Sequence, residues 1–363
     1  MKSDVKTRTL LLFAMVLTLT FTGPVFGEPD FEAGLDEMMS LDFTDSTIRT
    51  VLETIGDAGE LRFVFDPKVD LGARTSVSLS DVSVLNALRF VTRSNYLFYL
   101  PRDSKTVLIA PDTRQKRQEH MPQEIRTFEL EHADPKNVIT VLRSLLQTRS
   151  LVQDDRLNTI TMNDTIDQLD IAQEVIDRLD RRSGEAPVNL EPLWVGSADR
   201  HDMRSMGDSI PQLDVDMSQT TTLDPDDTTV RQVYKTLGDA AGIQFVFERS
   251  VDLGQQVSFD VPKMSVQETL DFVNQRFSHF SVIWGPRTIF IVPDSRGKRY
   301  AEEHVAIQFF YLFHAERKNV ITTLRSMIQV RQIAEIPRLN AVAVKDTLAN
   351  LRTAQELVEG MDR

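Results

Sequence analysis

The sequence repeats itself once, and this repeat limits how the chain can be built. Residues 41–181 return without a gap as residues 223–363, at a constant shift of 182 positions. About 40% of the aligned positions match, far above chance for a fixed register. The shared segments are spread along each copy and include FVF, VDLG, KNVIT and RLN. Whatever the chain does must therefore be within reach of one unit of about 140 residues used twice.

Hydrophobic periodicity divides each copy into two parts. The first part of copy one follows the order β-α-β-β-α-β-β, over residues 39–43, 46–56, 61–65, 75–80, 83–93, 96–100 and 106–110. The second part follows the order β-α-β-β-α, over residues 125–130, 135–145, 151–152, 157–162 and 164–179. Helices combined with short sheets in this way predict an α+β fold of four small modules, two of each kind.

We expect the modules at four positions, named here 1a (38–112), 1b (123–182), 2a (220–294) and 2b (305–363). Between the copies, residues 183–219 contain Gly and Pro without sustained periodicity, which predicts a flexible linker and loosely related pairs. The PLWV segment at 192–195 is an apolar island in this linker. It either docks onto a neighbouring module or forms a local turn.

A basic cluster follows the first module of each copy. Residues 114–117 read Arg-Gln-Lys-Arg within the polar stretch 111–123, and residues 296–299 read Arg-Gly-Lys-Arg. Such a cluster is typical of a solvated linker, which we favour, or of a surface for an acidic partner.

The N-terminus has the pattern of a cleaved signal peptide, predicted over residues 1–27. A basic start precedes the apolar run Leu10–Phe21, which is too short to span a bilayer comfortably. Gly23-Pro24 interrupts the run, and small residues precede Glu28. An uncleaved anchor is the alternative, and no later stretch is suited to cross a membrane as a helix. The chain has no cysteine, which excludes a lipoprotein anchor, disulfides and zinc–thiolate sites.

The charge balance argues against nucleic acid and anionic membrane surfaces as partners. Without residues 1–27 the chain keeps 38 Lys+Arg against 53 Asp+Glu, a balance of −15. The β-α-β-β-α order also occurs in KH domains, which grip nucleic acid with a GxxG loop. No such loop joins the expected elements here.

The sequence gives little support to catalysis. No HExxH, GxSxG, P-loop or GxGxxG motif occurs, and the six histidines form no ligand pair at helical spacing. His132 and His314 are equivalent and stand between a strand and a helix. They are either a metal or proton site or, as we favour, structural histidines bonded to a helix start. We predict a protein that is not an enzyme and has no cofactor or metal.

The order of motifs resembles a known family. The segments LDFTDSTIRTVLETI, LRFVFDPKVD, VSLSDVSVLNALRFV and VLIAPD make module 1a similar to the STN domain of secretins and TonB-dependent transducers. The segments FELEHADPKNVITVLRSLL and DDRLNTITMNDTIDQLDIAQEVIDRLD make module 1b similar to the KH-like secretin N-domain, and PRLNAVAVKDTLANLRTAQELVEGMD repeats this in module 2b.

The resemblance implies a periplasmic, non-enzymatic scaffold or adaptor. Secretins are outer-membrane channels whose N-terminal modules form periplasmic rings, so the implied partners are a secretin, a pilus component or an inner-membrane secretion component. Type II secretion and type IV pili are the implied pathways, and a weak homo-oligomer is also implied. No channel-forming segment follows the second copy, which is unlike a secretin. The alternative is an STN-type signalling module that binds an inner-membrane regulator.

Two sets of residues are candidates for these contacts. Short edge strands invite strand addition, which points to Met39, Leu41, Phe43 and Leu223. Matching basic residues of the KH-like modules suit lateral packing between modules, which points to Arg143, Arg156, Arg325 and Arg338. Duplication with surface charges that have not diverged explains the second set equally well.

Overall fold

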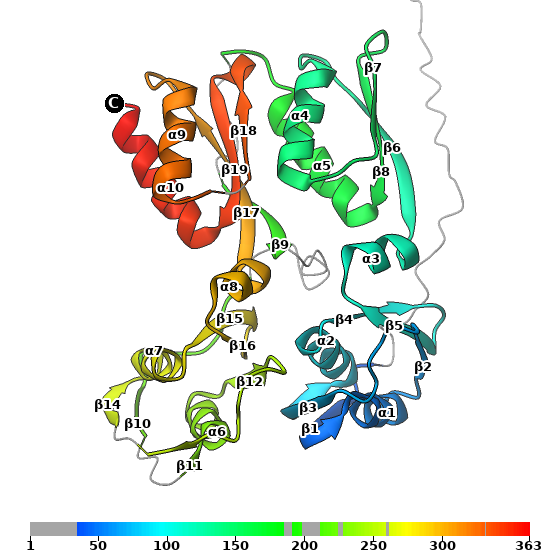
Figure 1. Ribbon diagram of the computed structural model, residues 1–363, viewed down its shortest axis with the longest axis vertical. Helices are drawn as coiled ribbons and strands as arrows, with labels where there is room; N and C mark the ends of the chain where they lie inside the picture. Colours follow the sequence, from blue (N-terminus) through cyan, green and yellow to red (C-terminus); the bar gives the residue numbers. More distant parts are fainter. Residues whose placement is uncertain (1–34, 185–190, 198–210, 224–227, 259–260, 331) are drawn as a thin grey trace, which may run out of the picture.

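A computed structural model describes residues 35–184, 191–197, 211–223, 228–258, 261–330 and 332–363 (Figure 1). The signal peptide predicted at 1–27 lies outside the described residues. Modules 1a and 2a lie at one end of the molecule and modules 1b and 2b at the other (Figure 1). In the part of the chain that the structure describes, no helix combines the length and apolar character needed to cross a bilayer.

Module 1a has the predicted order of elements. These are β1 (Met38–Thr47), α1 (Ile48–Ala58), β2 (Arg62–Phe65), β3 (Arg74–Ser83), α2 (Val84–Ser94), β4 (Leu97–Pro101) and β5 (Thr106–Pro111). Strands β1 and β3 pair antiparallel, and a second sheet has the order β2-β5-β4. The apolar face predicted for α1 is buried, because Ile48, Val51, Leu52 and Ile55 pack into the core of the module.

Module 1b is a three-stranded sheet covered by two helices. Its elements are β6 (Gln123–Glu129), α4 (Pro135–Leu146), β7 (Leu151–Asp154), β8 (Thr159–Thr165) and α5 (Ile166–Leu179), with the sheet order β6-β8-β7. Pro135 occupies the first turn of α4, where no backbone donor is needed.

The repeated RLN motif makes the turn that joins the last two strands of this module type. Asn158 has φ 54°, a left-handed conformation that asparagine tolerates better than most residues. Its side-chain amide donates to the Leu130 carbonyl. Asn340 repeats both features in module 2b, with φ 48° and a bond to Leu312 of 2.5 Å. The repeat therefore preserves a backbone turn.

Module 2a follows the same plan over its described residues. Its elements are β10 (Thr220–Leu223), β11 (Thr228–Thr229), α6 (Val230–Ala241), β12 (Gln244–Phe247), β13 (Gln256–Val257), β14 (Val261–Ser265), α7 (Val266–Phe277), β15 (His279–Gly285) and β16 (Thr288–Pro293). Strands β10 and β14 pair, β11 and β13 pair, and a third sheet has the order β12-β16-β15.

Module 2b contains β17 (His304–Tyr311), α9 (Arg317–Met327), β18 (Gln332–Ile336), a short 3-10 turn (Pro337–Leu339), β19 (Ala341–Thr347) and α10 (Leu348–Met361). Module 2b thus repeats the order predicted for module 1b, module 2a has the two predicted helices between its strands, and the predicted α+β fold class is confirmed.

Two predictions about the connecting segments are wrong. The basic clusters are not linkers, because they form the helices α3 (Arg114–His120) and α8 (Arg296–Glu302); Lys116 and Arg117 are buried, whereas Arg296 and Arg299 are exposed. Within the expected linker, Leu193–Ser197 form strand β9, which joins the sheet of module 2b in the order β18-β19-β17-β9. The PLWV island therefore docks onto a neighbouring module, because it can bury apolar side chains there.

The two copies also pack against each other, although the linker composition suggested loosely related pairs. One apolar cluster contains residues of both 1a and 2a, and a second contains residues of both 1b and 2b. Burial of apolar surface between the copies stabilises this arrangement.

Candidate interaction surfaces

The contact between modules 1b and 2b joins a sheet to a pair of helices. The sheet of 2b carries its own helices α9 and α10 on one face and packs its other face against α4 and α5 of module 1b (Figure 1). The second face is lined by Val305, Ile307, Phe309 and Ala343, all buried. The Arg178 guanidinium of α5 lies 5.5 Å from the centre of the Phe309 ring, within cation–π range.

Of the four predicted basic residues, the structure places only Arg338 in this contact. Its guanidinium donates to the carbonyls of Leu179 and Arg181, at the C-terminal end of α5. A cation there is favourable, because helix carbonyls at that end lack intrahelical partners. The equivalent Arg156 is exposed in module 1b, and Arg143 and Arg325 are exposed on α4 and α9.

The faces that point outward differ from the faces that meet. Where module 2b has Val305, Phe309 and Ala343, module 1b has Gln123, Thr127 and Thr161. The hydroxyls of Thr127 and Thr161 lie 2.9 Å apart and share a hydrogen bond across strands. The outer sheet face of 1b is therefore largely compatible with water. Its exposed apolar side chains are Ile125, Val152 and, in the adjoining turn, Leu157.

Modules 1a and 2a meet through aromatic and cationic side chains. Trp284 of β15 is 1% exposed and stacks on Phe90 of α2, with ring centres 6.0 Å apart. The Arg93 guanidinium lies 4.1 Å from the centre of the Trp284 ring. Lys298 of α8 also contacts Tyr96, with its ammonium 4.5 Å from the ring centre. A groove of about 590 Å³ runs along this contact and is lined by Ser80, Asn86, Asp239 and Arg287 among others.

The predicted strand-addition residues lie on short sheets. Leu41 is 2% exposed and belongs to the core of module 1a, whereas Met39 and Phe43 are half-buried. Strand β1 pairs with β3, with Leu41 opposite Leu79 and Phe43 opposite Val77, and this sheet has two strands. Leu223 ends β10 and lies opposite Val261 of β14. Each of these sheets has an outer edge with which no described strand pairs.

Helix α3 is held by buried ion pairs that the sequence analysis missed. The Lys116 ammonium lies 2.7 Å from Asp66 and 2.8 Å from Glu119, and the imidazole of His120 is 2.9 Å from Asp66. The hydrogen bond from Lys116 lowers the pKa of the Asp66 carboxyl well below its usual range. In copy two, Lys298 of α8 lies 3.3 Å from Glu248, the residue equivalent to Asp66. Both copies carry an acidic residue and a lysine at these matched positions, and this repetition was the sequence signal for the ion pair.

The same cluster holds three groups that commonly bind metals. One ligand atom from each of Asp66, Glu119 and His120 lies within 4.8 Å of the others. The Lys116 ammonium already bonds to both carboxylates. A cation entering between them would have to displace that ammonium, so the arrangement suits an internal ion pair better than a metal site.

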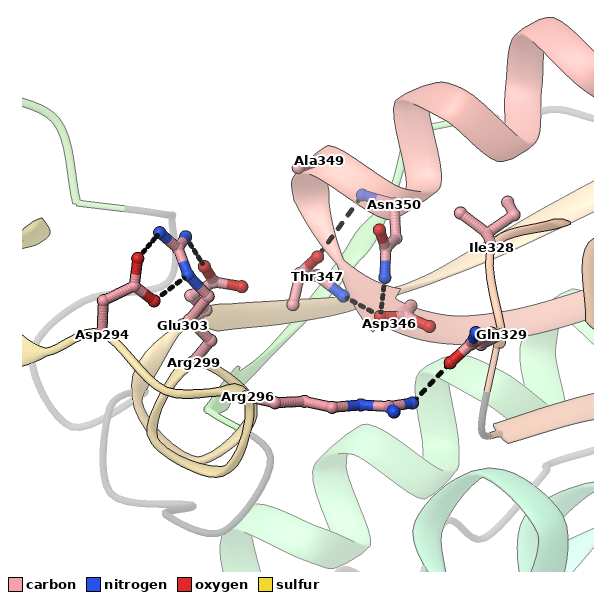
Figure 2. A pocket seen from close by; sticks show the side chains of 10 residues that line it. All are labelled: Asp294, Arg296, Arg299, Glu303, Ile328, Gln329, Asp346, Thr347, Ala349 and Asn350. Atoms are coloured by element: carbon pink, nitrogen blue, oxygen red, sulfur yellow. Dashed lines mark hydrogen bonds and ion pairs between the residues drawn. The ribbon is translucent and has the colours of Figure 1, made fainter. Parts of the chain in front are cut away.

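A polar pocket of about 530 Å³ separates α8 from module 2b (Figure 2). Arg299 is bound on both sides, 2.5 Å from Asp294 and 3.0 Å from Glu303, and the bond to Asp294 raises its pKa. Arg296 reaches across the pocket to Gln329 at 2.6 Å. The charged side chains of the pocket are thus bonded to other residues that line it, and Arg296 links α8 to module 2b.

The segments that contain His132 and His314 are held by backbone hydrogen bonds, and the rings of His132 and His304 contact neighbouring groups. The backbone N–H groups of residues 131–133 donate to the carboxylate of Asp180, each at 2.7 Å, and those of residues 313–315 donate to Asp362 in the same way. The imidazole of His132 accepts from Arg182 at 3.4 Å rather than bonding the next helix. His304 is half-buried beside Trp194, and its Nε2 lies 2.8 Å from the Ile283 carbonyl. Burial lowers the pKa of His304 to about 4.

A comparison with family models finds one match. Residues 125–185 match the model described as Secretin_N, a bacterial type II/III secretion system short domain. The match covers module 1b, where the sequence analysis identified a KH-like secretin N-domain. A comparison with curated proteins finds no match.

Solved structures of secretin N-terminal regions are similar to parts of the chain. The N-terminal domain of the secretin XcpQ from Pseudomonas aeruginosa is 14% identical, over 66% of this chain and 100% of that chain, with a TM-score of 0.18. The type IV competence pilus secretin PilQ of V. cholerae is 20% identical, over 40% of this chain and 39% of that chain, with a TM-score of 0.19. The GspC–GspD complex from the type II secretion system of enterotoxigenic Escherichia coli is 12% identical, over 40% of this chain and 99% of that chain, with a TM-score of 0.17.

Proposed function

We propose, on the premise that residues 125–185 form a secretin N-terminal-type domain, that the chain is a non-enzymatic periplasmic scaffold or adaptor. The chain is a secretin N-domain-like protein, and such domains are structural modules of the periplasm. Its partner would be a secretin, a pilus component or an inner-membrane component of a type II secretion or type IV pilus apparatus. The proposal is carried by the packing of the sheet of module 2b on the helices of module 1b within one chain. Modules that pack in this way are suited to assembly.

Partner capture is assigned to the outer edge of β1, beside Met39, Leu41 and Phe43, with the edge of β10 near Leu223 as its repeat. An edge strand offers unpaired N–H and C=O groups to an incoming strand. Leu41 lies in the core, so the test must use an exposed neighbour. Asp42 is exposed on β1, and Glu53 is exposed on α1 of the same module.

The absence of native cysteine makes single-cysteine crosslinking a direct test. Asp42→Cys and Glu53→Cys would each carry a short heterobifunctional crosslinker in the cell envelope, and captured proteins would be identified by mass spectrometry. We expect Asp42→Cys to capture a secretin, pilus or inner-membrane secretion component, and Glu53→Cys not to. Capture of a transcriptional regulator of the inner membrane would favour the signalling alternative. Equal capture by both variants, or none, would refute the assignment to β1.

Self-association is expected to be weak. The largely polar outer sheet face of module 1b, and the −15 balance of the chain without residues 1–27, oppose strong association at low salt. The exposed Arg143, Arg156 and Arg325 then add only weak, salt-dependent contacts. Sedimentation across protein and salt concentration should show mostly monomer, and a closed oligomer at micromolar concentration would contradict this expectation.

A further inference from the structure

Strands β6 and β17 are equivalent in the repeat, but they differ in their neighbours. In module 2b, β9 pairs antiparallel with β17, with Val305 opposite Gly196 and Ile307 opposite Leu193. In module 1b the sheet order is β6-β8-β7, and no described strand pairs with the outer edge of β6. One copy of this module therefore has its edge filled and the other has the same edge open.

An exposed apolar side chain lies beside the open edge. Ile125, on the outer face of β6, is 69% exposed, whereas the equivalent Ile307 of β17 is covered by α4 and α5 of module 1b and lies opposite Leu193 of β9. Backbone groups on an open edge also lack the partners that a strand neighbour would supply. An extended segment placed beside β6 would pair with these backbone groups, and its apolar side chains would cover Ile125.

Strand β9 shows which side chains such a segment needs. Leu193, Trp194 and Val195 are all buried. Leu193 and Val195 join the apolar cluster with module 1b, and Trp194 points to the other side, where its ring lies 6.1 Å from that of His304. This alternation is typical of a strand whose two faces are both covered.

The central residue of the β9 segment Leu193–Val195 is Trp194, and the residue opposite this position differs between β17 and β6. Trp194 lies opposite Ala306 in β17, and the equivalent of Ala306 in β6 is the exposed Glu124. Arg126 on the same strand is already bound to Asp170 at 2.7 Å, and it lies 3.4 Å from Glu124. A basic side chain at the central position of an incoming strand would face Glu124, and opposite charges across strands are favourable.

We propose that the outer edge of β6 binds an extended segment of a partner protein, in antiparallel pairing, with the pattern apolar–basic–apolar. The pairing is that of β9 on β17, with the basic residue in place of Trp194. This surface is distinct from the β1 edge, and its failure would leave the proposed function standing.

The test uses the full chain and fluorescein-labelled peptides. The probe EPLKVGS has the sequence of residues 191–197 with lysine in place of Trp194, and a version with proline in place of Val195 is the control for backbone pairing. We expect the probe to bind in fluorescence anisotropy and the proline version not to bind. Hydrogen–deuterium exchange should slow within Gln123–Glu129 and stay unchanged within His304–Tyr311.

Two matched variants separate the edge of the sheet from its face. Ile125 lies on β6 and Val152 on the far strand β7, and both are 69% exposed on the outer face. Ile125→Ser should weaken binding about tenfold, because it removes apolar cover worth about 1.4 kcal/mol, while Val152→Ser should leave affinity within about twofold. Equal losses in both variants would show docking on the face and overturn the proposal.

A charge reversal tests the basic position. Glu124→Lys should weaken binding of the lysine probe about threefold, and a probe with glutamate at that position should regain the loss. No binding of the lysine probe at millimolar concentration, or protection in His304–Tyr311 instead of Gln123–Glu129, would also overturn the proposal. The first result would mean that the edge is not available, and the second that the peptide displaces β9.

Discussion

Replacing Arg338 with alanine tests whether the two copies form one stable unit. The side chain is half-buried and donates to two carbonyls at the end of α5. Hydrogen bonds from a charged group contribute about 1.5–3 kcal/mol each, and a cation at a helix C-terminus adds about 0.3–1 kcal/mol. Since solvent can replace part of these contacts, we expect Arg338→Ala to lower the free energy of unfolding by about 2 kcal/mol.

The repeat supplies the matched control, because Arg156 occupies the equivalent turn but is exposed. Arg156→Ala should change the free energy of unfolding by less than about 0.5 kcal/mol. Urea unfolding is monitored by the fluorescence of Trp194 and Trp284, both buried where modules meet. With a slope of about 2 kcal/mol per molar urea, the Arg338 variant should shift the midpoint by about 1 M. Equal midpoints for the two variants would show that the reasoning about this contact is wrong.

Three further predictions follow from the buried groups and from the linker. Lys116→Met should lower the thermal midpoint by several degrees, because it leaves the buried Asp66 carboxylate without its ammonium, and adding Asp66→Asn should recover most of the loss in calorimetry. The pKa of His304 is lowered to about 4 in the folded protein, from 6.5. The unfolded chain therefore binds the proton first, so this group's contribution to stability falls as pH drops from about 6.5 to about 4, and His304→Gln should flatten the urea midpoints over that range. Limited proteolysis should cut first within 183–219 but outside Leu193–Ser197, and early cuts within 41–181 would contradict the module boundaries proposed from the sequence.

Local structure was predictable because each module follows a simple pattern. The helix predicted at residues 83–93 is α2 (Val84–Ser94), and the predicted hairpin is β4 and β5. These elements depend on neighbours in their own module, so periodicity and turn chemistry are enough to place them. The family resemblance of module 1b was also readable, and the family comparison supports it over residues 125–185.

The contacts between copies were harder to predict because they depend on residues far apart in sequence. One signal was present: β17 reads HVAIQFFY, a nearly continuous apolar run, whereas β6 reads QEIRTFE, in which only Ile125 and Phe128 are apolar. A continuous run indicates a strand covered on both faces. The burial of Lys116 and Arg117 was missed for a different reason, since a short run of charges is typical of an exposed segment, although Lys116 pairs with the distant Asp66 and Arg117 with the nearby Asp112.

The differences between the copies bear on assembly more strongly than their similarities. A duplicated module that packs sheet to helices could continue that contact from chain to chain without limit, since the contact is heterologous. Here Val305, Phe309 and Ala343 line the sheet face that is used, while Gln123, Thr127 and Thr161 line the equivalent face that points outward. Terminal repeats of stacked proteins carry polar outer faces for the same physical reason, because a free apolar face would aggregate. The polar residues on the outer sheet face of module 1b therefore disfavour a further sheet-to-helix contact there. A partner of this chain would gain more by pairing with an open strand edge than by packing on that face.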